Sequence, residues 1–269
     1  MATIHPTAHV DGEAKLADDA EIGPGCVIEG GVVIGAGCVL REYAIVRRGT
    51  RLGSDNRVGP FCVLGGEPQD LKFDPATETR LVIGDSNTFR ENVTISRGSK
   101  PETPTTVGNN TYWMTSAHAG HDATVADDCI LTNGVAIGGH ATVGRGAVLS
   151  AYTAVHQFTW IGERAMTQGH SGFSTHLPPF VIGRHINEVA GLNIVGLKRA
   201  KDITDEDREQ IKEAYALVYR RGLPQDRAIA EMDAHGEWGA AAGRFREFVR
   251  AVRQAEPLYK RGLASPRAR

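Results

Sequence analysis

The chain of 269 residues carries a formal net charge of −2, with acidic and basic residues mixed along its length. This pattern excludes the basic field that nucleic-acid-binding proteins use, so we expect no nucleic-acid partner. No segment approaches the roughly twenty apolar residues of a membrane span, and the first residues lack the pattern of a signal peptide. Four cysteines lack the spacing of a zinc site or a disulfide framework: Cys26, Cys38, Cys62 and Cys129. We therefore expect reduced thiols and a cytoplasmic protein without a membrane span.

A six-residue period dominates most of the chain. Counting from Ile4, an aliphatic residue recurs every six residues up to Leu64, and a second, mostly aliphatic run extends from Val107 to Ile161. Between the two runs the register holds at Ile83, Phe89 and Ile95. A period of six is neither the 3.6 of a helix nor the alternation of a strand. It is typical of a parallel β-helix, in which each hexapeptide supplies one short strand and one turn.

The repeat also predicts where the regular coils are interrupted. Three hexapeptides close one coil of about eighteen residues, and about eight coils stack roughly 4.8 Å apart. Residues 65–80 and 96–106 leave the register, so we expect them to form loops that extend from the coils. Each cysteine follows an inward-facing position by four residues, which predicts a small buried side chain rather than a reactive one.

The pattern becomes helical from about Gly191. Thr204 precedes a stretch that is acidic at its start and basic at its end, and Gly222 is a suitable terminator. Further helices are expected from about Gln225 and over residues 240–255.

These patterns together predict a mainly β protein. We expect a left-handed parallel β-helix over residues 1–190 and a small α-helical C-terminal domain over residues 191–269. A β-helical prism of this kind usually buries one face against copies of itself, so we expect a homotrimer.

The densest candidate chemistry lies around His118, His121 and Asp122. In the eighteen-residue register, His121, His140 and His156 fall near one corner of successive coils, within about 10 Å. One such histidine is ordinarily a solvated turn residue, but three beside an aspartate indicate a site. The residues leave open a metal site between subunits, as in hexapeptide carbonic anhydrases, and a general base oriented by Asp122. A trimeric scaffold without catalysis is a third alternative.

Two other segments carry polar residues without a fixed interpretation. Residues 65–73 of the first loop have the composition of an ordinary surface loop. Lys198 and Arg199 form either a solvated face or a site for a diphosphate.

Six motifs together are much more specific than the hexapeptides: PQDLKF, ENVTISRG, SAHAGHD, TAVHQF, LPPFVI and GLNIVGLKR. On these motifs almost the whole chain resembles the UDP-N-acetylglucosamine 3-O-acyltransferases, the first enzymes of lipid A synthesis. The resemblance implies direct attack of the sugar 3-hydroxyl on a 3-hydroxyacyl thioester of acyl carrier protein. It implies no acyl-enzyme, cofactor or metal, and the partners are acyl carrier protein and UDP-N-acetylglucosamine.

The resemblance also implies residue roles. His121 matches the general base, Asp122 its orienting carboxylate, and Gly139 a backbone N–H that stabilises the thioester oxyanion. Substrate contacts are implied for the sugar, phosphate, nucleotide and acyl parts: Asp70, Lys72, His118, His140, His156, Gln157, Gly169, Asn193 and Arg199.

The chain departs from the family pattern near the nucleotide residues. The segment from Gly183 to Ala190 is one residue shorter, and Val195 and Ala200 stand where the family often has an acidic residue and an arginine. The 3-amino analogue of the sugar therefore remains an alternative acceptor. Gly169 matches the position that limits acyl length in the family, although it is equally explained as an ordinary turn glycine.

Overall fold

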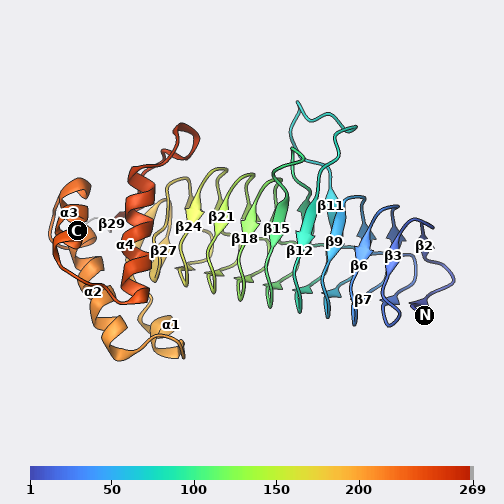
Figure 1. The fold of residues 1–269 in the computed structure, drawn as a ribbon, viewed down its shortest axis with the longest axis horizontal. Coiled ribbons are helices and arrows are strands. Elements are labelled where there is room, and N and C mark those ends of the chain that lie inside the picture. Colours follow the sequence, from blue (N-terminus) through green and yellow to red (C-terminus); the bar gives the residue numbers. More distant parts are fainter. Residues whose placement is uncertain (267–269) are drawn as a thin grey trace.

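A computed structural model describes residues 1–266 and confirms the mainly β fold. The chain winds as a left-handed parallel β-helix whose short strands form three faces, with a group of helices at its C-terminal end (Figure 1). The aliphatic residue of each hexapeptide is the inward-facing member of a strand, as at Ile22 and Leu131, which are both buried. The six-residue period therefore sets both the strand positions and the core.

Each face is a continuous sheet that takes every third strand along the chain, except that face A ends with β27, β28 and β29 after β25. Face A contains β1 Thr3–Ile4, β4 Glu21–Ile22, β7 Val39–Leu40, β10 Arg57–Val58, β13 Thr88–Phe89, β16 Tyr112–Trp113, β19 Ile130–Leu131, β22 Val148–Leu149, β25 Met166–Thr167, β27 Val181–Arg184, β28 Glu188–Leu192 and β29 Ser265–Pro266. Face B contains β2 His9–Val10, β5 Val27–Ile28, β8 Ile45–Val46, β11 Val63–Gly66, β14 Thr94–Ser96, β17 His118–Ala119, β20 Ala136–Ile137, β23 Ala154–Val155 and β26 Gly172–Phe173. Face C contains β3 Lys15–Leu16, β6 Val33–Ile34, β9 Thr50–Leu52, β12 Leu81–Ile83, β15 Thr105–Val107, β18 Thr124–Val125, β21 Thr142–Val143 and β24 Trp160–Ile161.

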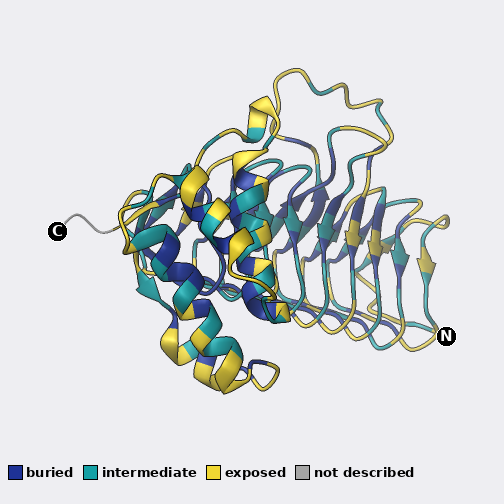
Figure 2. Ribbon diagram, turned by 60° about the vertical axis from the view of Figure 1, so that its left-hand side comes forward, coloured by how far each residue is buried: buried dark blue, intermediate teal, exposed yellow. Residues whose placement is uncertain are grey.

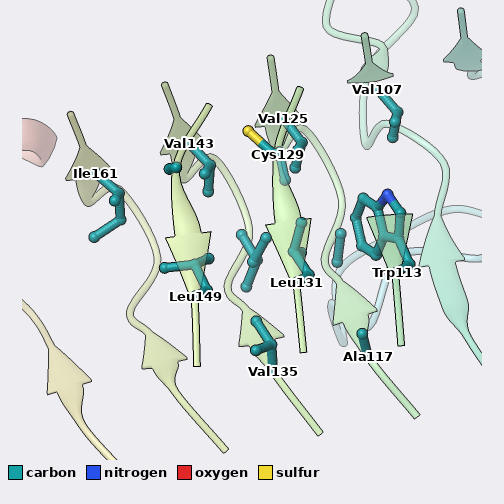
Figure 3. Close-up of a cluster of buried hydrophobic side chains, with 14 of the residues drawn as sticks. Val107, Trp113, Ala117, Val125, Cys129, Leu131, Val135, Val143, Leu149 and Ile161 are labelled. Atoms are coloured by element: carbon teal, nitrogen blue, oxygen red, sulfur yellow. The ribbon is translucent and has the colours of Figure 1, made fainter. Parts of the chain in front are cut away.

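The core is a column of aliphatic side chains that fills the inside of the coils (Figure 3). Leu131 and Val143, from faces A and C, are fully buried, and Cys129 lies among them. All four cysteines are free and buried. Burial raises the pKa of the Cys62 thiol to about 11, so it stays protonated and unreactive at neutral pH. The cysteines are therefore core residues, as their spacing predicted.

The coils continue beyond the last aliphatic position that the sequence pattern identified, Ile161. Thr167 of β25 and Phe173 of β26 occupy the next two inward positions and are buried. The Thr167 hydroxyl lies 2.7 Å from the Thr153 hydroxyl, so the polar group has a partner inside the coil. A buried threonine with a local partner interrupts the hydrophobic pattern without interrupting the fold.

Both expected loops extend from the coils. Residues 67–80 connect β11 to β12 and are mostly exposed, whereas the coils have a buried interior (Figure 2). Residues 97–104 connect β14 to β15. Since β11 and β14 both belong to face B, the two loops leave the prism at the same corner, between faces B and C.

The helices cover the last coils (Figure 1). They are α1 Ile194–Arg199, α2 Asp205–Tyr219, α3 Gln225–Ala234, α4 Ala240–Arg253 and the 3₁₀ helix η1 Pro257–Tyr259. Thr204 caps α2 in a capping box with Asp207, and Gly222 follows with a positive φ of 66°. Among residues 1–266, no helix is long and apolar enough to cross a membrane.

The end of the chain returns from the helices to the β-helix. Strand β29 pairs with β28, and the backbone of His176 exchanges hydrogen bonds with Gly262 and Ala264. We call residues 256–266 the C-terminal strap. It joins the helices to the last coils.

Candidate active site

His121 and Asp122 form a hydrogen-bonded pair at the corner between faces B and C. They follow β17, and the His121 Nδ1 lies 2.6 Å from the Asp122 Oδ2. The side chains are 15% and 2% exposed. Because the carboxylate accepts the proton on Nδ1, the other ring nitrogen, Nε2, carries the free lone pair. The pair therefore has the chemistry of an oriented general base.

The second oxygen of Asp122 is also held. Its Oδ1 accepts hydrogen bonds from the Ser99 backbone N–H at 2.9 Å and from the Thr103 hydroxyl at 2.5 Å. Burial alone raises the pKa of this carboxyl, but the hydrogen bonds from His121, Thr103 and Ser99 outweigh it and hold the pKa well below the usual range. Asp122 is therefore an anion at neutral pH in spite of its burial.

Gly139 lies directly against the His121 ring. A Cβ on Gly139 would be 2.9 Å from Cε1 and 3.0 Å from Nε2 of His121, closer than a methyl group tolerates. A Cβ on Gly120 would in turn lie 2.8 Å from the Gly139 nitrogen. The two glycines thus leave room for the imidazole beside an accessible backbone N–H. The predicted base and the predicted oxyanion donor are neighbours.

The other predicted histidines surround this pair in different ways. His140 approaches the carboxylate of the pair: its Nε2 is 3.3 Å from the Asp122 Oδ2, and its ring centre is 5.2 Å from that of His121. His118 lines the groove, and its Nδ1 is 2.8 Å from the Thr94 hydroxyl. Burial lowers the pKa of its imidazole. Burial also lowers the pKa of His140, against the opposing effect of Asp122. Both rings are therefore suited to neutral hydrogen bonding rather than to ion pairing.

An apolar groove of about 600 Å³ begins at His121 and runs along face B toward the C-terminal end. Its floor consists of outward-facing positions of β20, β23 and β26, which pair in register as Ala136, Ala154 and Gly172. Small residues at each of these positions leave the groove open. His156, Gln157 and Gln69 also line it.

Ile186 lines the groove beside Gly172 of β26. It lies between β27 and β28 and lines the groove there, although its side chain remains 72% exposed. A Cβ on Gly172 would lie 2.9 Å from the Ile186 Cδ1, so the two residues are in close contact. The predicted length-limiting residue, Gly169, lies on the turn between β25 and β26 and is not among the residues that line this groove.

The predicted residues of the first loop are exposed. Gln69, which the sequence motif contained but the site prediction omitted, reaches the groove, whereas Asp70 uses its carboxylate to accept from the Lys72 backbone N–H at 3.0 Å. Leu71, in the same loop, is fully exposed. Within one chain, the Lys72 side chain therefore has no described partner at the groove.

Asn193 and Arg199 lie at another corner of the prism. The Asn193 side chain caps α1 by accepting from the Gly196 N–H at 3.0 Å, and it donates to the Arg164 carbonyl at 3.1 Å. Arg164 is in the turn between β24 of face C and β25 of face A. One chain therefore does not bring Asn193 and Arg199 together with His121, and the capping role of Asn193 was not visible in the sequence.

The residues of a metal site come close together, but their geometry is that of a hydrogen-bonded cluster. Ligand atoms of His121, Asp122 and His140 lie within 4.8 Å of one another. However, two ligands that are each about 2.1 Å from a tetrahedral zinc ion must be well over 3 Å apart. The 2.6 Å contact between His121 and Asp122 is too short for that, and Oδ1 already accepts two hydrogen bonds.

Comparison with known proteins identifies the family. An acyl-[acyl-carrier-protein]–UDP-N-acetylglucosamine O-acyltransferase of Stutzerimonas stutzeri is 37% identical over 253 residues, which cover 93% of this chain and 97% of the relative. The chain belongs to this acyltransferase family. Residues 177–263 also match the family model described as UDP-N-acetylglucosamine O-acyltransferase, domain 2.

Solved structures of the family agree over nearly the whole chain. The UDP-N-acetylglucosamine O-acyltransferase of Moraxella catarrhalis has a TM-score of 0.90 at 35% identity, and covers 97% of this chain and 99% of its own. The enzyme of Bacteroides fragilis has a TM-score of 0.88 at 34% identity with the same coverage. The Arabidopsis enzyme reaches 0.83 at 28% identity and covers 97% of this chain and 100% of its own.

Proposed function

We propose that this protein transfers a 3-hydroxyacyl group from acyl carrier protein to the 3-hydroxyl of UDP-N-acetylglucosamine, the first step of lipid A biosynthesis. The names of the relatives supply the donor and acceptor classes. The structural observation that carries the proposal is that the His121–Asp122 pair opens onto an apolar groove. The free, buried cysteines suit a reducing cytoplasm, in which we place the reaction.

The geometry supports a direct acyl transfer, without an acyl-enzyme, in which His121 is the general base. The His121 Nε2 takes the proton of the sugar 3-hydroxyl while that oxygen attacks the thioester carbonyl carbon. The carbon–sulfur bond then breaks, and the imidazolium returns the proton to the departing thiolate of the carrier. Asp122 holds Nδ1–H throughout and stabilises the transient imidazolium charge.

The oxyanion of the tetrahedral intermediate requires a donor close to the base. The Gly139 backbone N–H is next to the His121 ring and is kept accessible by Gly120. A backbone donor fixed within a coil needs no reorganisation during the reaction, which is the source of such stabilisation. We assign the contacts with the sugar and the acyl carbonyl to His118, His156 and Gln157, which line the groove, whereas the His140 Nε2 lies 3.3 Å from the Asp122 carboxylate.

We further propose that the acyl chain lies along face B and ends at Ile186. Ala136, Ala154 and Gly172 present a flat apolar floor, and each methylene buried there contributes about 0.8 kcal/mol. The support for Ile186 over Gly169 is that Ile186 lines the groove beside Gly172, whereas Gly169 does not line it. The shorter segment between Gly183 and Ala190 is the part of the chain that sets the position of Ile186.

A homotrimer with sites between subunits completes the proposal. Asn193 and Arg199, the proposed nucleotide contacts, lie near the corner between faces C and A, whereas His121 lies at the corner between faces B and C. A second chain is needed to place them beside the same substrate. The fully exposed Leu71 on the first loop is likewise suited to contact a neighbouring subunit.

The direct test is an acyl-transfer assay with a panel of acyl carrier protein thioesters. Both UDP-N-acetylglucosamine and its 3-amino analogue are offered, and product formation is followed by mass spectrometry. We expect ester formation on UDP-N-acetylglucosamine from 3-hydroxyacyl donors. Preferred transfer to the amine would replace the acceptor, and no transfer to either sugar would refute the proposed activity.

Mixed trimers test the placement of the site. We expect His121→Ala and Arg199→Ala homotrimers each to lose activity, the latter mainly through a raised KM for the nucleotide sugar. Trimers that contain both variants should regain part of the activity, because some sites combine an intact His121 from one chain with an intact Arg199 from another. An active monomer in sedimentation, or no recovery in mixed trimers, would contradict a shared site.

A further inference from the structure

The second loop, residues 97–104, ends on the catalytic pair. From this loop, the Ser99 N–H and the Thr103 hydroxyl both donate to the Asp122 Oδ1. The first residue after it, Thr105, accepts from the Asp122 backbone N–H at 2.8 Å. The loop and the residue that follows it thus contact both the side chain and the main chain of Asp122. Neither Ser99 nor Thr103 was singled out by the sequence motifs.

The loop is built so that its two arms meet at this point. Lys100 and Thr103 form an antiparallel bridge, and the Thr103 N–H donates to the Lys100 carbonyl at 3.2 Å. A Cβ on Gly98 would lie 2.0 Å from the Thr103 carbonyl oxygen, so only glycine allows the arms to approach this closely. The ends are fixed by Arg80, whose carbonyl accepts from the Gly98 and Thr105 N–H groups. This is a rigid hairpin rather than a loose connection.

The two carboxylate oxygens of Asp122 have separate partners. Oδ1 is occupied by the hairpin, whereas Oδ2 faces His121 at 2.6 Å and His140 at 3.3 Å. With Oδ1 fixed, rotation of the carboxylate is blocked and Oδ2 stays directed at the Nδ1 of His121. The hydrogen bonds from Thr103 and Ser99 also help to keep the buried carboxylate ionised, as its lowered pKa reflects.

We propose that Thr103 is a positioning residue for the acyl transfer, and that it acts by fixing the Asp122 carboxylate, and through it the His121 base. This inference rests on the proposed roles of His121 and Asp122. Thr103 itself does not contact the reacting atoms in the proposal. Its effect on the reaction must therefore pass through the charge of Asp122. The loss of the Thr103 hydroxyl should then matter only while residue 122 is an aspartate.

A double-mutant cycle between Thr103→Val and Asp122→Asn tests this. Valine keeps the shape of threonine but removes the donor. In the wild-type background we expect kcat to fall about tenfold with KM nearly unchanged, because a hydrogen bond to a charged group is lost. In the Asp122→Asn background the same substitution should change kcat by less than about twofold. Thr103→Ser, which restores the donor, should recover most of the wild-type rate.

Thr106→Val is the matched control. Thr106 lies on β15, three residues after Thr103, and its hydroxyl donates to the Thr124 hydroxyl at 3.2 Å instead of to Asp122. We expect its kcat to stay within about twofold of the wild type. Thermal melting checks that every variant is folded, and Thr103→Ala provides the cycle if the valine variant is not.

The outcomes separate this inference from the proposed function. If Asp122→Asn is fully active, the dyad itself is wrong. If Asp122→Asn is impaired but Thr103→Val keeps the wild-type kcat, the dyad stands and the role of Thr103 is refuted. An equal loss in both backgrounds would show that Thr103 acts on the fold instead, and would also overturn the inference.

Discussion

The corner between faces B and C is built differently at the two ends of the β-helix. In the N-terminal coils its left-handed position is a glycine, Gly31 or Gly49, each with a φ of 77°. In the coils that carry the site it is Asp122, His140 or Phe158, with φ values of 59°, 58° and 59°. Compared with glycine, a residue with a Cβ destabilises the fold by about 1 kcal/mol or more in this left-handed conformation. At this corner, larger side chains are present where the proposed chemistry uses them.

Face B differs between the same two regions. Its outward positions are Val27, Ile45 and Val63 in the N-terminal coils but Ala136, Ala154 and, on β26, Gly172 beyond the site. The backbone register is unchanged, so only side-chain size separates a filled face from a groove. Both differences teach that the inward residues determine the fold, whereas the outward residues of the same coils determine the site.

The largest effect is expected when the base is removed. His121→Ala should lower kcat by about 10² to 10⁴-fold, the usual contribution of a positioned general base, while the melting temperature changes little. The matched variant is Arg48→Ala, at the equivalent corner position one coil before the first loop, where the exposed side chain should be dispensable for kcat. Steady-state kinetics on both variants check this. A nearly wild-type kcat for His121→Ala would exclude it as the base.

The core should respond equally in both regions. Leu131→Ala in the site coils and Ile28→Ala in the N-terminal coils each remove a fully buried aliphatic side chain. Each should lower the free energy of unfolding by about 2–5 kcal/mol, measured by denaturant titration at one fixed protein concentration. A much larger loss at Leu131 would mean that the site coils are packed more strictly than the N-terminal ones.

The sequence predicted the fold well because one strong period repeats through the core. The predicted β-helix of residues 1–190 includes Thr167 and Phe173, but the period did not identify them as inward positions, since a buried threonine with a nearby hydroxyl partner does not appear in a hydrophobic pattern. It identified His121, Asp122 and Gly139 together. Ser99 and Thr103 could not be found in this way, because a backbone N–H leaves no trace in the sequence and the contact depends on how an irregular loop folds.

The next smaller effect is a change in the preferred acyl chain length when the groove on face B is altered. Ile186→Ala should open its end, so the preferred donor should lengthen, with each added methylene improving kcat/KM by up to about fourfold. Gly169→Met should leave the preference unchanged if Ile186 is the stop, although a family resemblance alone would predict shortening. Competition between donors of different length measures both. A shorter preferred donor in Gly169→Met, with no change in Ile186→Ala, would reverse the assignment.

The smallest expected effect is on the pH dependence of stability. It involves the C-terminal strap, which contacts the last coils and not the N-terminal ones. The fully buried His176 accepts from the Trp160 N–H on Nδ1 and donates from Nε2 to the Tyr259 carbonyl. Burial lowers the pKa of this imidazole, which must therefore be neutral in the folded chain.

The sign of the pH effect follows from that shift. Below about pH 6.5 the unfolded chain binds a proton at His176 that the folded chain still excludes, so stability falls as the pH drops from 7 toward the lowered pKa. We expect His176→Gln to reduce this loss of stability between pH 7 and pH 5, measured by denaturant titration at both pH values. An unchanged pH dependence would show that His176 does not carry it.

The C-terminal strap has a consequence for the order in which the molecule is made. Each coil touches mainly its neighbours, so coils can stack in turn as the chain leaves the ribosome. The Tyr259 hydroxyl, however, donates to the His140 carbonyl at 3.4 Å across 119 residues, and the Tyr259 ring packs edge-on against Phe158. The residue that supports the catalytic corner thus emerges only after all the coils. We expect chains that lack residues 256–266 to form the coils but to transfer acyl groups slowly, because the contacts of Tyr259 with His140 and Phe158 are then missing.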